Sequence, residues 1–521
     1  MRDITGVENF SEDCLQLARK HLLMVDRIID TCGDMSLYEY SRTLTTTPGI
    51  NSYQSRADLL GIVYDYIEPL LGEGVAQQAV KDLDNYPVVL TANHHGVEYF
   101  SQTFQARLIF ALQALQKGAL TSTIPVFACG NIPLNNVVYP RGALIYQAAP
   151  EEFEKIPVKL PVFPDRLKRS IVSATPGFNS EMINRAWLKA SQLFKNKKIS
   201  LPVADALHDI FQKNYERDSV VQLPAYSDQS VVVNYLIWKQ LFPQIDTVPD
   251  SICLELERIV TRLMEIDLSN PQSLLWFILF DPELRFHILA ELDGINGCWN
   301  RETPEHQQCK SSQVKCGTAF FWGVDDKGRK VSLNIKTNNA NMQILSGIDD
   351  NGNAWEWPYS PESIIKGISE GHLLPSGFSC YAVLLFARGL SCIGGYLQGI
   401  YLPAMKKGLV SALNKNQKYK HIADIVDQAR ADHYSDGMLA VMTKIDDKYL
   451  VPAGPLEIIA GGGITKSDID KMSKLTVREA HLADMFDTIP DAVPLKTLPH
   501  EWKKKLATAS YQSLRFKVVV K

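Results

Sequence analysis

The stretch Tyr86–Glu98, YPVVLTANHHGVE, decides how the rest of the chain is interpreted. A short apolar run ends abruptly in Asn-His-His-Gly, and apolar side chains then recur at helical spacing. They are Val97, Phe100, Phe104, Leu108 and Leu112. The pattern predicts a buried strand that feeds a helix. We expect Asn93 to be the N-cap of that helix. His94 and His95 would then occupy its first turn, with Glu98 within side-chain reach of both imidazoles.

Two imidazoles and a carboxylate at the end of a buried strand predict a catalytic site. Open α/β sheets bind their ligands at the carboxyl ends of their strands. Histidine exchanges protons near neutral pH, and a carboxylate beside it fixes its tautomer and raises its basicity. The alternative is that Asn93, His94 and His95 only cap a helix. We assign His94, His95 and Glu98 as candidate catalytic residues.

The composition is that of an average soluble protein. Of the 521 residues, 45% are hydrophobic and 21% are charged, and the net charge of -4 gives no basic excess that would indicate nucleic acid. The N-terminus carries charges where a signal peptide needs an apolar core, and the apolar run 381–393 is broken by Arg388 and too short to cross a bilayer. Nine cysteines, an odd number, suit a reducing compartment. These features predict a cytoplasmic protein without a membrane span.

The order of the elements predicts an α/β fold with a parallel or mixed sheet. Residues 1–84 show helical spacing and form a helical N-terminal region. A second buried strand, IPVFACG at 124–130, follows the first after a helical crossover, which is the signature of parallel neighbours. We assign 85–291 to an α/β domain that carries the site. Residues 292–521 are assigned to an α+β region, where apolar runs flanking Asp-Asp-Lys-Gly predict a β-hairpin.

Two other segments receive helical predictions. The chain is mostly helical from 180 to 286, and SICLELERIVTRLMEI, residues 251–266, is strongly amphipathic at helical spacing. His433 and Asp436 are placed on a helix surface, where both are solvated.

Polar residues after the strand candidates predict where a substrate binds. Two further apolar runs, 143–147 and 160–163, also end in polar turns. If all four runs belong to one sheet, their polar ends meet at one edge. The candidate substrate-binding residues are Asn93, Cys129, Asn131, Asn135, Arg141, Asp165 and Arg166. Cys129 is either a nucleophile with a histidine as its base or, as is commoner for free cysteines, a buried structural thiol.

One cysteine-rich stretch has the residue types of a metal site. Four soft ligands, Cys298, His306, Cys309 and Cys316, would suffice for tetrahedral zinc. Their spacing lacks the Cys-x-x-Cys pairs of common zinc folds. We therefore assign no metal, and structural zinc stays an alternative. We also expect these cysteines not to form disulfides, because no export signal is present.

Three motifs occur in an order that resembles the glycerolipid acyltransferases. That family carries Asn-His, then a Gly-Ala-Ile-type strand, then Phe-Pro-Glu-Gly. This chain has Asn93-His94, Gly142–Ile145 and Phe163–Arg166 in the same order. Tyr99 stands where the family has an aspartate, with Glu98 one residue earlier, and Arg166 replaces the final glycine. The resemblance implies acyl transfer as a mechanism, and we do not infer membership of the family from it.

The sequence predicts a metabolic enzyme that acts on a small molecule or a carrier-linked acyl group. His94 or His95 would be the general base, Glu98 would orient it, and backbone amides or Asn131 would stabilise negative charge. In a rival prediction, His94, His95 and Glu98 bind a divalent metal in a hydrolase or lyase. In another, the protein only binds a ligand or an assembly partner. The cofactor is unknown, nucleic acid is not expected as a partner, and a homo-oligomer stays open.

Overall fold

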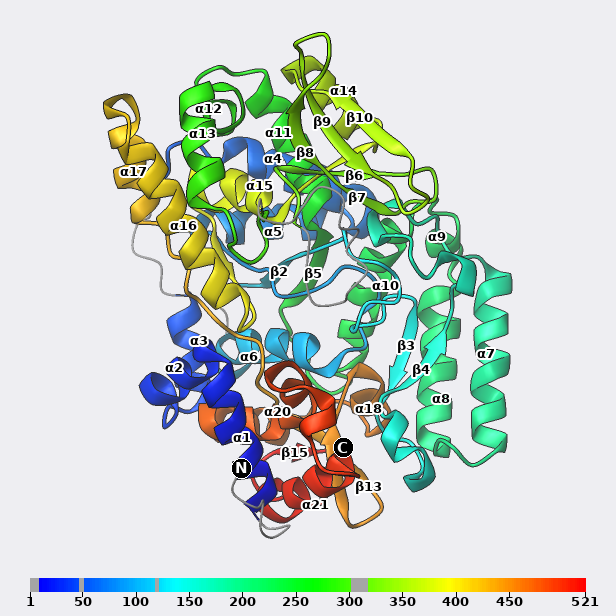
Figure 1. The fold of residues 1–521 in the computed structure, drawn as a ribbon. Helices are drawn as coiled ribbons and strands as arrows, with labels where there is room; N and C mark the ends of the chain where they lie inside the picture. Colours follow the sequence, from blue (N-terminus) through cyan, green and yellow to red (C-terminus); the bar gives the residue numbers. More distant parts are fainter. Residues whose placement is uncertain (1–8, 46–50, 118–120, 301–316) are drawn as a thin grey trace.

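A four-stranded parallel sheet lies in the middle of the structure (Figure 1). The computed structural model describes residues 9–45, 51–117, 121–300 and 317–521. The strand order is β12-β1-β2-β5, and each neighbouring pair is parallel. The strands are β1 (Val88–Leu90), β2 (Thr123–Ala128), β5 (Asp250–Glu255) and β12 (Ser391–Ile393). The predicted parallel pairing of the first two strands is confirmed, and the fold is α/β.

The sheet separates two hydrophobic cores. Side chains alternate along β1, so Val88 and Leu90 belong to one core and Val89 to the other. The helices of the first core are α1 (Phe10–His21), α2 (Leu23–Cys32), α3 (Leu37–Thr45), α6 (Ser101–Lys117), α7 (Ser180–Lys195), α8 (Leu201–Ile210), α9 (Asp218–Val221), α10 (Tyr226–Gln240), α18 (Pro455–Ala460), α19 (Lys466–Lys474), α20 (Val477–Ala492) and α21 (Trp502–Leu514). Those of the second are α4 (Ala57–Leu71), α5 (Glu73–Asn85), α11 (Leu256–Leu268), α12 (Leu274–Phe280), α13 (Pro282–Glu291), α14 (Pro361–Ser369), α15 (Gly377–Tyr381), α16 (Gln398–Asn414) and α17 (Lys420–Asp427). Within the described residues, no helix is long and apolar enough to span a membrane.

Four small sheets surround the parallel one. The predicted hairpin is confirmed: β6 (Phe321–Val324) and β7 (Lys330–Ser332) pair antiparallel, with β11 (Leu373–Pro375) on the other side of β6. A second small sheet contains β8 (Asn334–Thr337), β9 (Gln343–Ile348) and β10 (Ala354–Pro358). A third contains β13 (Val441–Ile445), β14 (Tyr449–Pro452) and β15 (Val519–Val520). The last pairs β3 (Gly142–Ile145) with β4 (Val158–Pro161). The runs at 143–147 and 160–163 therefore pair with each other and do not join the central sheet.

Strand β5 corrects the helical prediction for residues 251–266. It pairs with β2 along its whole length, from Asp250 opposite Thr123 to Glu255 opposite Ala128. Helix α11 begins at the next residue, Leu256, without an intervening turn. Apolar residues continue across this junction, so the helical spacing of α11 concealed the strand in front of it. The regions predicted at 85–291 and 292–521 both supply strands to the central sheet, because β12 lies beside β1.

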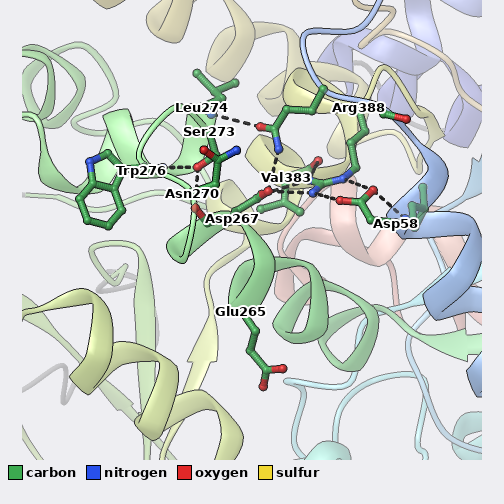
Figure 2. Close-up of polar contacts among 12 residues, drawn as sticks. Asp58, Glu265, Asp267, Asn270, Ser273, Leu274, Trp276, Val383 and Arg388 are labelled. Carbon is green, nitrogen blue, oxygen red and sulfur yellow. Dashed lines mark hydrogen bonds and ion pairs between the residues drawn. The ribbon is translucent and has the colours of Figure 1, made fainter.

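A buried arginine ties three segments together on the second core's side of the sheet (Figure 2). Arg388 follows a π-helical segment, Ala382–Ala387, and its side chain is fully buried. One of its terminal nitrogens, Nη2, lies 2.6 Å from Asp58 Oδ2 on α4 and 2.8 Å from Asp267 Oδ1 on α11. Burial alone would lower the pKa of Arg388, but the two carboxylates hold it above its ordinary value. Arg388, the charged residue within the apolar run 381–393, thus acts as a structural clamp between α4 and α11.

We expect Arg388→Met to lower the free energy of unfolding by about 3–5 kcal/mol, because it leaves two carboxylates without their cation. Arg27→Met is the control, since Arg27 pairs with Asp432 on the surface and should contribute less than about 1 kcal/mol. Denaturant titration of both variants measures the difference. Equal stability of the two variants would contradict the assignment of Arg388 as a clamp.

Candidate functional site

A cavity of about 650 Å³ lies at the carboxyl ends of the parallel strands. The segment that follows each strand contributes to its lining: His94 after β1, Cys129 after β2, Glu257 after β5 and Gly395 after β12. A volume of this size accommodates a small molecule. The end of β1, where the sequence predicted a site, therefore forms one wall of this cavity.

The segment after β1 is extended where a helix was predicted. His95 donates its backbone N–H to Cys129 O at 2.8 Å, and Cys129 N–H donates to Asn93 O at 2.9 Å. These bonds prolong the pairing of β1 with β2 and make His94 and Cys129 bridge partners. Helix α6 begins only at Ser101, so the prediction that Asn93 is its N-cap is wrong.

Gly96 allows this segment to turn toward α6. Its φ of 127° lies in the region that favours glycine, and a Cβ atom there would lie 2.5 Å from Pro140 Cβ. The backbone of the Asn-His-His-Gly motif is thus shaped by its glycine and by strand pairing.

Glu98 points to a buried cation and makes no hydrogen bond to either histidine. It forms an ion pair with Arg107 of α6, and the two side chains are 5% and 1% exposed. Its other oxygen accepts hydrogen bonds from Asn93 Nδ2 at 2.8 Å and from the Thr103 hydroxyl. The expected contact relied on the helical spacing of residues 94 and 98, and residues 94–98 are not helical. The predicted contact of Glu98 with the imidazoles is therefore wrong.

His95 is buried and does not line the cavity. Its Nε2 lies 2.9 Å from Ser227 Oγ, and that hydroxyl donates to Glu255 at the end of β5. Burial lowers the pKa of His95 below its ordinary value, although the nearby Glu255 opposes the shift. His95 thus joins α10 to the end of β5.

His94 lies on the cavity wall as a neutral imidazole. Burial lowers its pKa to about 4. Its Nδ1 is 3.2 Å from Asn136 Oδ1, an oxygen that also accepts from Val138 N–H. Nδ1 therefore carries the proton, and Nε2 is the hydrogen-bond acceptor.

Cys129 and Glu257 are hydrogen-bonded to each other on the cavity wall. The thiol donates to Glu257 Oε1 at 3.2 Å, and Gly130 N–H donates to Glu257 Oε2 at 2.6 Å. Burial and the neighbouring Glu255 raise the pKa of Glu257 to about 7. Burial and the Glu257 carboxylate raise the pKa of Cys129 well above its usual value. The resting thiol is neutral, and the group beside it titrates near neutral pH.

A lysine of the β6–β7 hairpin lies behind this pair. Lys330 Nζ is 3.3 Å from Asn131 Oδ1 and 4.4 Å from the centre of the Trp322 ring. Burial lowers the pKa of Lys330, while Cys129 and Glu257 act in the opposite direction. Asn131 lines the cavity, as the sequence predicted for a residue after β2.

The remaining candidate substrate-binding residues lie away from the cavity. Arg141 donates to Phe163 O at 3.0 Å and forms an ion pair with Asp165 at 3.1 Å. Asn135 and Arg166 are exposed. The clustering of Asn135 and Asp165 with His94 assumes a single sheet, and that assumption is wrong because β3 and β4 form their own sheet. Neither residue lines the cavity, although Asn136, next to Asn135, contacts His94.

An acidic wall faces the same cavity from the C-terminal part of the chain. It consists of Asp436, Asp484, Asp487 and Asp491; Asp484 lies behind the three that line the cavity. The last three residues are spaced three and four apart on α20, so they share one helix face. Asp436 reaches the cavity because Gly394, after β12, pairs with Tyr434. The structure therefore corrects the predicted solvated helix surface for His433 and Asp436.

Burial raises the pKa of three carboxyl groups of the acidic wall. Burial raises the pKa of Asp436 to about 7 and of Asp487 to about 6, and it raises that of Asp484 well above its usual value. Tyr396 donates its hydroxyl to Asp491, and Gln102 Nε2 donates to Asp484 at 2.6 Å. One oxygen each of Asp436 and Asp484, Oδ1 in both, is buried without a hydrogen-bond partner.

Sequence reasoning missed Glu257 and the acidic wall, although both leave a signal. Glu255 and Glu257 end an apolar run, as the polar residues after β1 and β2 do. In AHLADMFDTIPDA, three aspartates lie on a helix that is otherwise mostly apolar. Acidic residues on a buried helix face cost free energy unless they are paired or hydrogen-bonded, so such a pattern is a signal of function.

The described residues offer no cluster of side chains that could bind a metal ion. Those residues contain no group of three or more His, Cys, Asp or Glu side chains placed to hold an ion. Of the four residues considered for zinc, Cys298 is a buried free thiol. His306, Cys309 and Cys316 lie outside the described residues.

Comparison of the chain with protein-family models, curated proteins and solved structures finds no match in any of the three. Function is therefore argued from the geometry of the cavity.

We expect Glu98→Gln to lower the free energy of unfolding by about 3–5 kcal/mol, because Arg107 would stay buried without its anion. Glu181→Gln is the control, because Glu181 is three-quarters exposed in its pair with Arg185 and should contribute less than about 1 kcal/mol. Thermal and denaturant unfolding measure both changes. If Glu98→Gln lost activity but kept its stability, Glu98 would be a catalytic residue, as the sequence predicted.

Proposed function

We propose that the protein is an enzyme that transfers an acyl group to or from a small molecule or a carrier-linked substrate bound in the cavity. Cys129 is the nucleophile and Glu257 is its general base. The observation that carries the proposal is the 3.2 Å hydrogen bond from Cys129 Sγ to Glu257 Oε1 at the cavity wall. Nucleophile and base within hydrogen-bond reach are the minimum arrangement for covalent catalysis.

Glu257 suits the role of base better than His94 does. A general base works best when its pKa lies near the operating pH. The pKa of Glu257 is about 7, whereas that of His94 is about 4. The imidazole of His94 is therefore a much weaker base than the carboxylate of Glu257. His94 Nε2 remains an acceptor on the same wall, where it can position a hydroxyl or amino group of the substrate. The proposal thus moves the base from the histidines to the end of β5.

The reaction has two balanced steps. Cys129 Sγ attacks the acyl carbonyl carbon as its proton passes to the Glu257 carboxylate. The bond to the leaving group breaks, and Glu257 returns the proton to that group. An acceptor then attacks the thioester, gives its proton to Glu257, and the protonated Glu257 supplies the thiol with a proton as the C–S bond breaks.

Burial and the Glu257 carboxylate disfavour negative charge at the sulfur, and Lys330 partly offsets their effect. The charge of Lys330 lowers the pKa of Cys129, opposing the effect of burial. All cysteines within the described residues are free thiols, which suits a nucleophile in the reducing, cytoplasmic setting that we infer from the composition.

We expect p-nitrophenyl acetate to acetylate Cys129 as the main product, because this activated ester needs no specific acceptor. Glu257→Gln should slow acetylation on the order of a hundredfold or more, the usual contribution of a general base. Intact-mass measurement and peptide mapping locate the acetyl group, and thermal melts show that each variant is folded.

Cys129→Ser should show no acetylation at this position. Cys32→Ser is the matched control, because Cys32 is a partly buried thiol away from the cavity, and it should react as the parent protein does. Equal rates in Glu257→Gln and the parent protein would overturn the proposal.

The pH dependence of this acetylation should follow Glu257. A carboxyl group accepts a proton only when ionised, so the rate should rise with pH through the pKa of about 7. A second rise, from ionisation of the free thiol, belongs to much higher pH because the pKa of Cys129 is raised. Glu257→Gln should lose the first rise and keep the second. A parent profile that is flat around pH 7 would exclude Glu257 as the base.

A further inference from the structure

We propose that the acidic wall binds the ammonium group of an aliphatic amine, so that the substrate or acceptor of the enzyme carries a positive charge. Four carboxyl groups gather at this wall, and three of them line the cavity. Lys503 is the lysine whose charge reaches Asp487. Its Nζ donates to the carbonyls of Glu154 and Ile156 and to none of the four carboxyl groups. Two more lysines, Lys155 and Lys159, line the cavity, and among the described residues Lys155 pairs with Glu152 and Lys159 lies over the Tyr139 ring, so no lysine of the lining forms an ion pair with the acidic wall.

A second, independent observation is that one oxygen of Asp436 has no hydrogen-bond donor among the described residues. Its side chain is 94% buried and lines the cavity, yet its Oδ1 has no hydrogen-bond partner. A buried carboxylate oxygen without a donor costs free energy. The carboxyl group packs closely on Gly395, where a Cβ atom would lie 2.8 Å from its other oxygen, Oδ2. An ammonium group has three N–H donors and no acceptor, which matches this orphaned oxygen and its neighbours.

Aromatic rings on the same side of the cavity favour an organic cation over an inorganic one. Tyr396, Phe486 and Trp502 line the cavity beside the carboxyl groups. The ammonium group of Lys503 lies 5.7 Å from the centre of the Phe486 ring and 5.9 Å from that of Trp502, so these two rings already contact a cation. Ring faces attract ammonium groups and pack against methylene groups. The described residues hold no cluster suited to a metal ion. A flexible aliphatic amine would place its ammonium group at the carboxyl groups and its methylene groups against the aromatic side chains.

This inference deepens the proposed function, because it names the class of substrate that the acyl-transfer site would serve. The amine-binding wall and the Cys129–Glu257 pair are separate parts of one cavity. The two proposals can therefore fail independently, and binding is measured without turnover.

The test is calorimetric titration of the full chain with putrescine and with butanediol, which has hydroxyl groups in place of the amino groups. Putrescine should bind, and butanediol should bind at least about tenfold more weakly. Asp436→Asn should weaken putrescine binding by roughly tenfold or more, the usual loss for a charged hydrogen bond. Asp424→Asn is the matched control on the surface of α17 and should bind as the parent protein does.

The pH dependence gives a second readout. Asp436 and Asp487 interact with each other and with Glu98, Asp484, Asp491, Ser101, Tyr146, Tyr396, Tyr434, the Gly437 backbone and Lys503. Because the two aspartates hold protons near neutral pH and an ammonium group favours their ionised forms, affinity should rise from about pH 6 to about pH 8. Putrescine stays charged across this range. Proton release on binding, read from the dependence of the heat on buffer, should accompany it.

Three results would overturn the inference: butanediol binding as tightly as putrescine, unchanged affinity in Asp436→Asn, or magnesium chloride displacing putrescine at equal concentration. Cys129→Ser should bind putrescine as the parent protein does. Binding of putrescine together with failure of acetylation at Cys129 would reject the acyl-transfer proposal and support the amine site. The converse result would reject the amine site alone.

Discussion

The buried ion pair between Glu98 and Arg107 holds the site in place. Arg107 also donates to Ser251 Oγ at 3.1 Å and Cys253 Sγ at 3.3 Å on β5, and Glu98 accepts from Asn93 in the segment after β1. One pair of charges thus joins helix α6, the end of β1 and the strand two places away in the sheet. Because neither charge reaches water, each depends on the other, and the backbone that carries them has little freedom to rearrange. That fixed backbone sets the position of His94 against the end of β2.

The acidic wall is built on the opposite principle. Glu98 has a cation for its charge, whereas Asp436 and Asp484 each keep an oxygen without a partner. The paired Glu98 stabilises the fold, whereas the unpaired carboxyl groups of the acidic wall destabilise it. Buried carboxyl groups that repel one another favour their protonated forms. Proteins tolerate such unfavourable groups mainly where function requires them. Within the described part of the chain, Glu98 and Asp436 thus differ in that only the first has a counter-ion for its buried charge.

Sequence patterns predicted the parts of the fold that depend on local chemistry. The parallel pairing of β1 and β2 followed from two apolar runs joined by a helical crossover, and the β6–β7 hairpin followed from its turn residues. His94, Cys129 and Asn131 were correctly placed near one another because strand ends in a parallel sheet share an edge. The contact of Glu98 with the histidines was wrong because it assumed a helix that Gly96 and strand pairing prevent. Strand β5 was missed because α11 continues its apolar pattern without a turn. Asp436 and the aspartates of α20 reach the cavity only through tertiary packing, which no local spacing reveals.

The position of β12 beside β1 affects the order in which the sheet can form during synthesis. This strand lies against β1, and the Thr91 hydroxyl donates to Ile393 O across 302 residues of chain. Contacts between such distant segments close large loops and form late, after local structure is in place. The edge of the sheet, the loop that carries Asp436 and helix α20 all emerge from the ribosome after the rest of the parallel sheet. A nascent chain that already contains Cys129 and Glu257 therefore still lacks the acidic wall, which is added only when residues 436–491 have been synthesised.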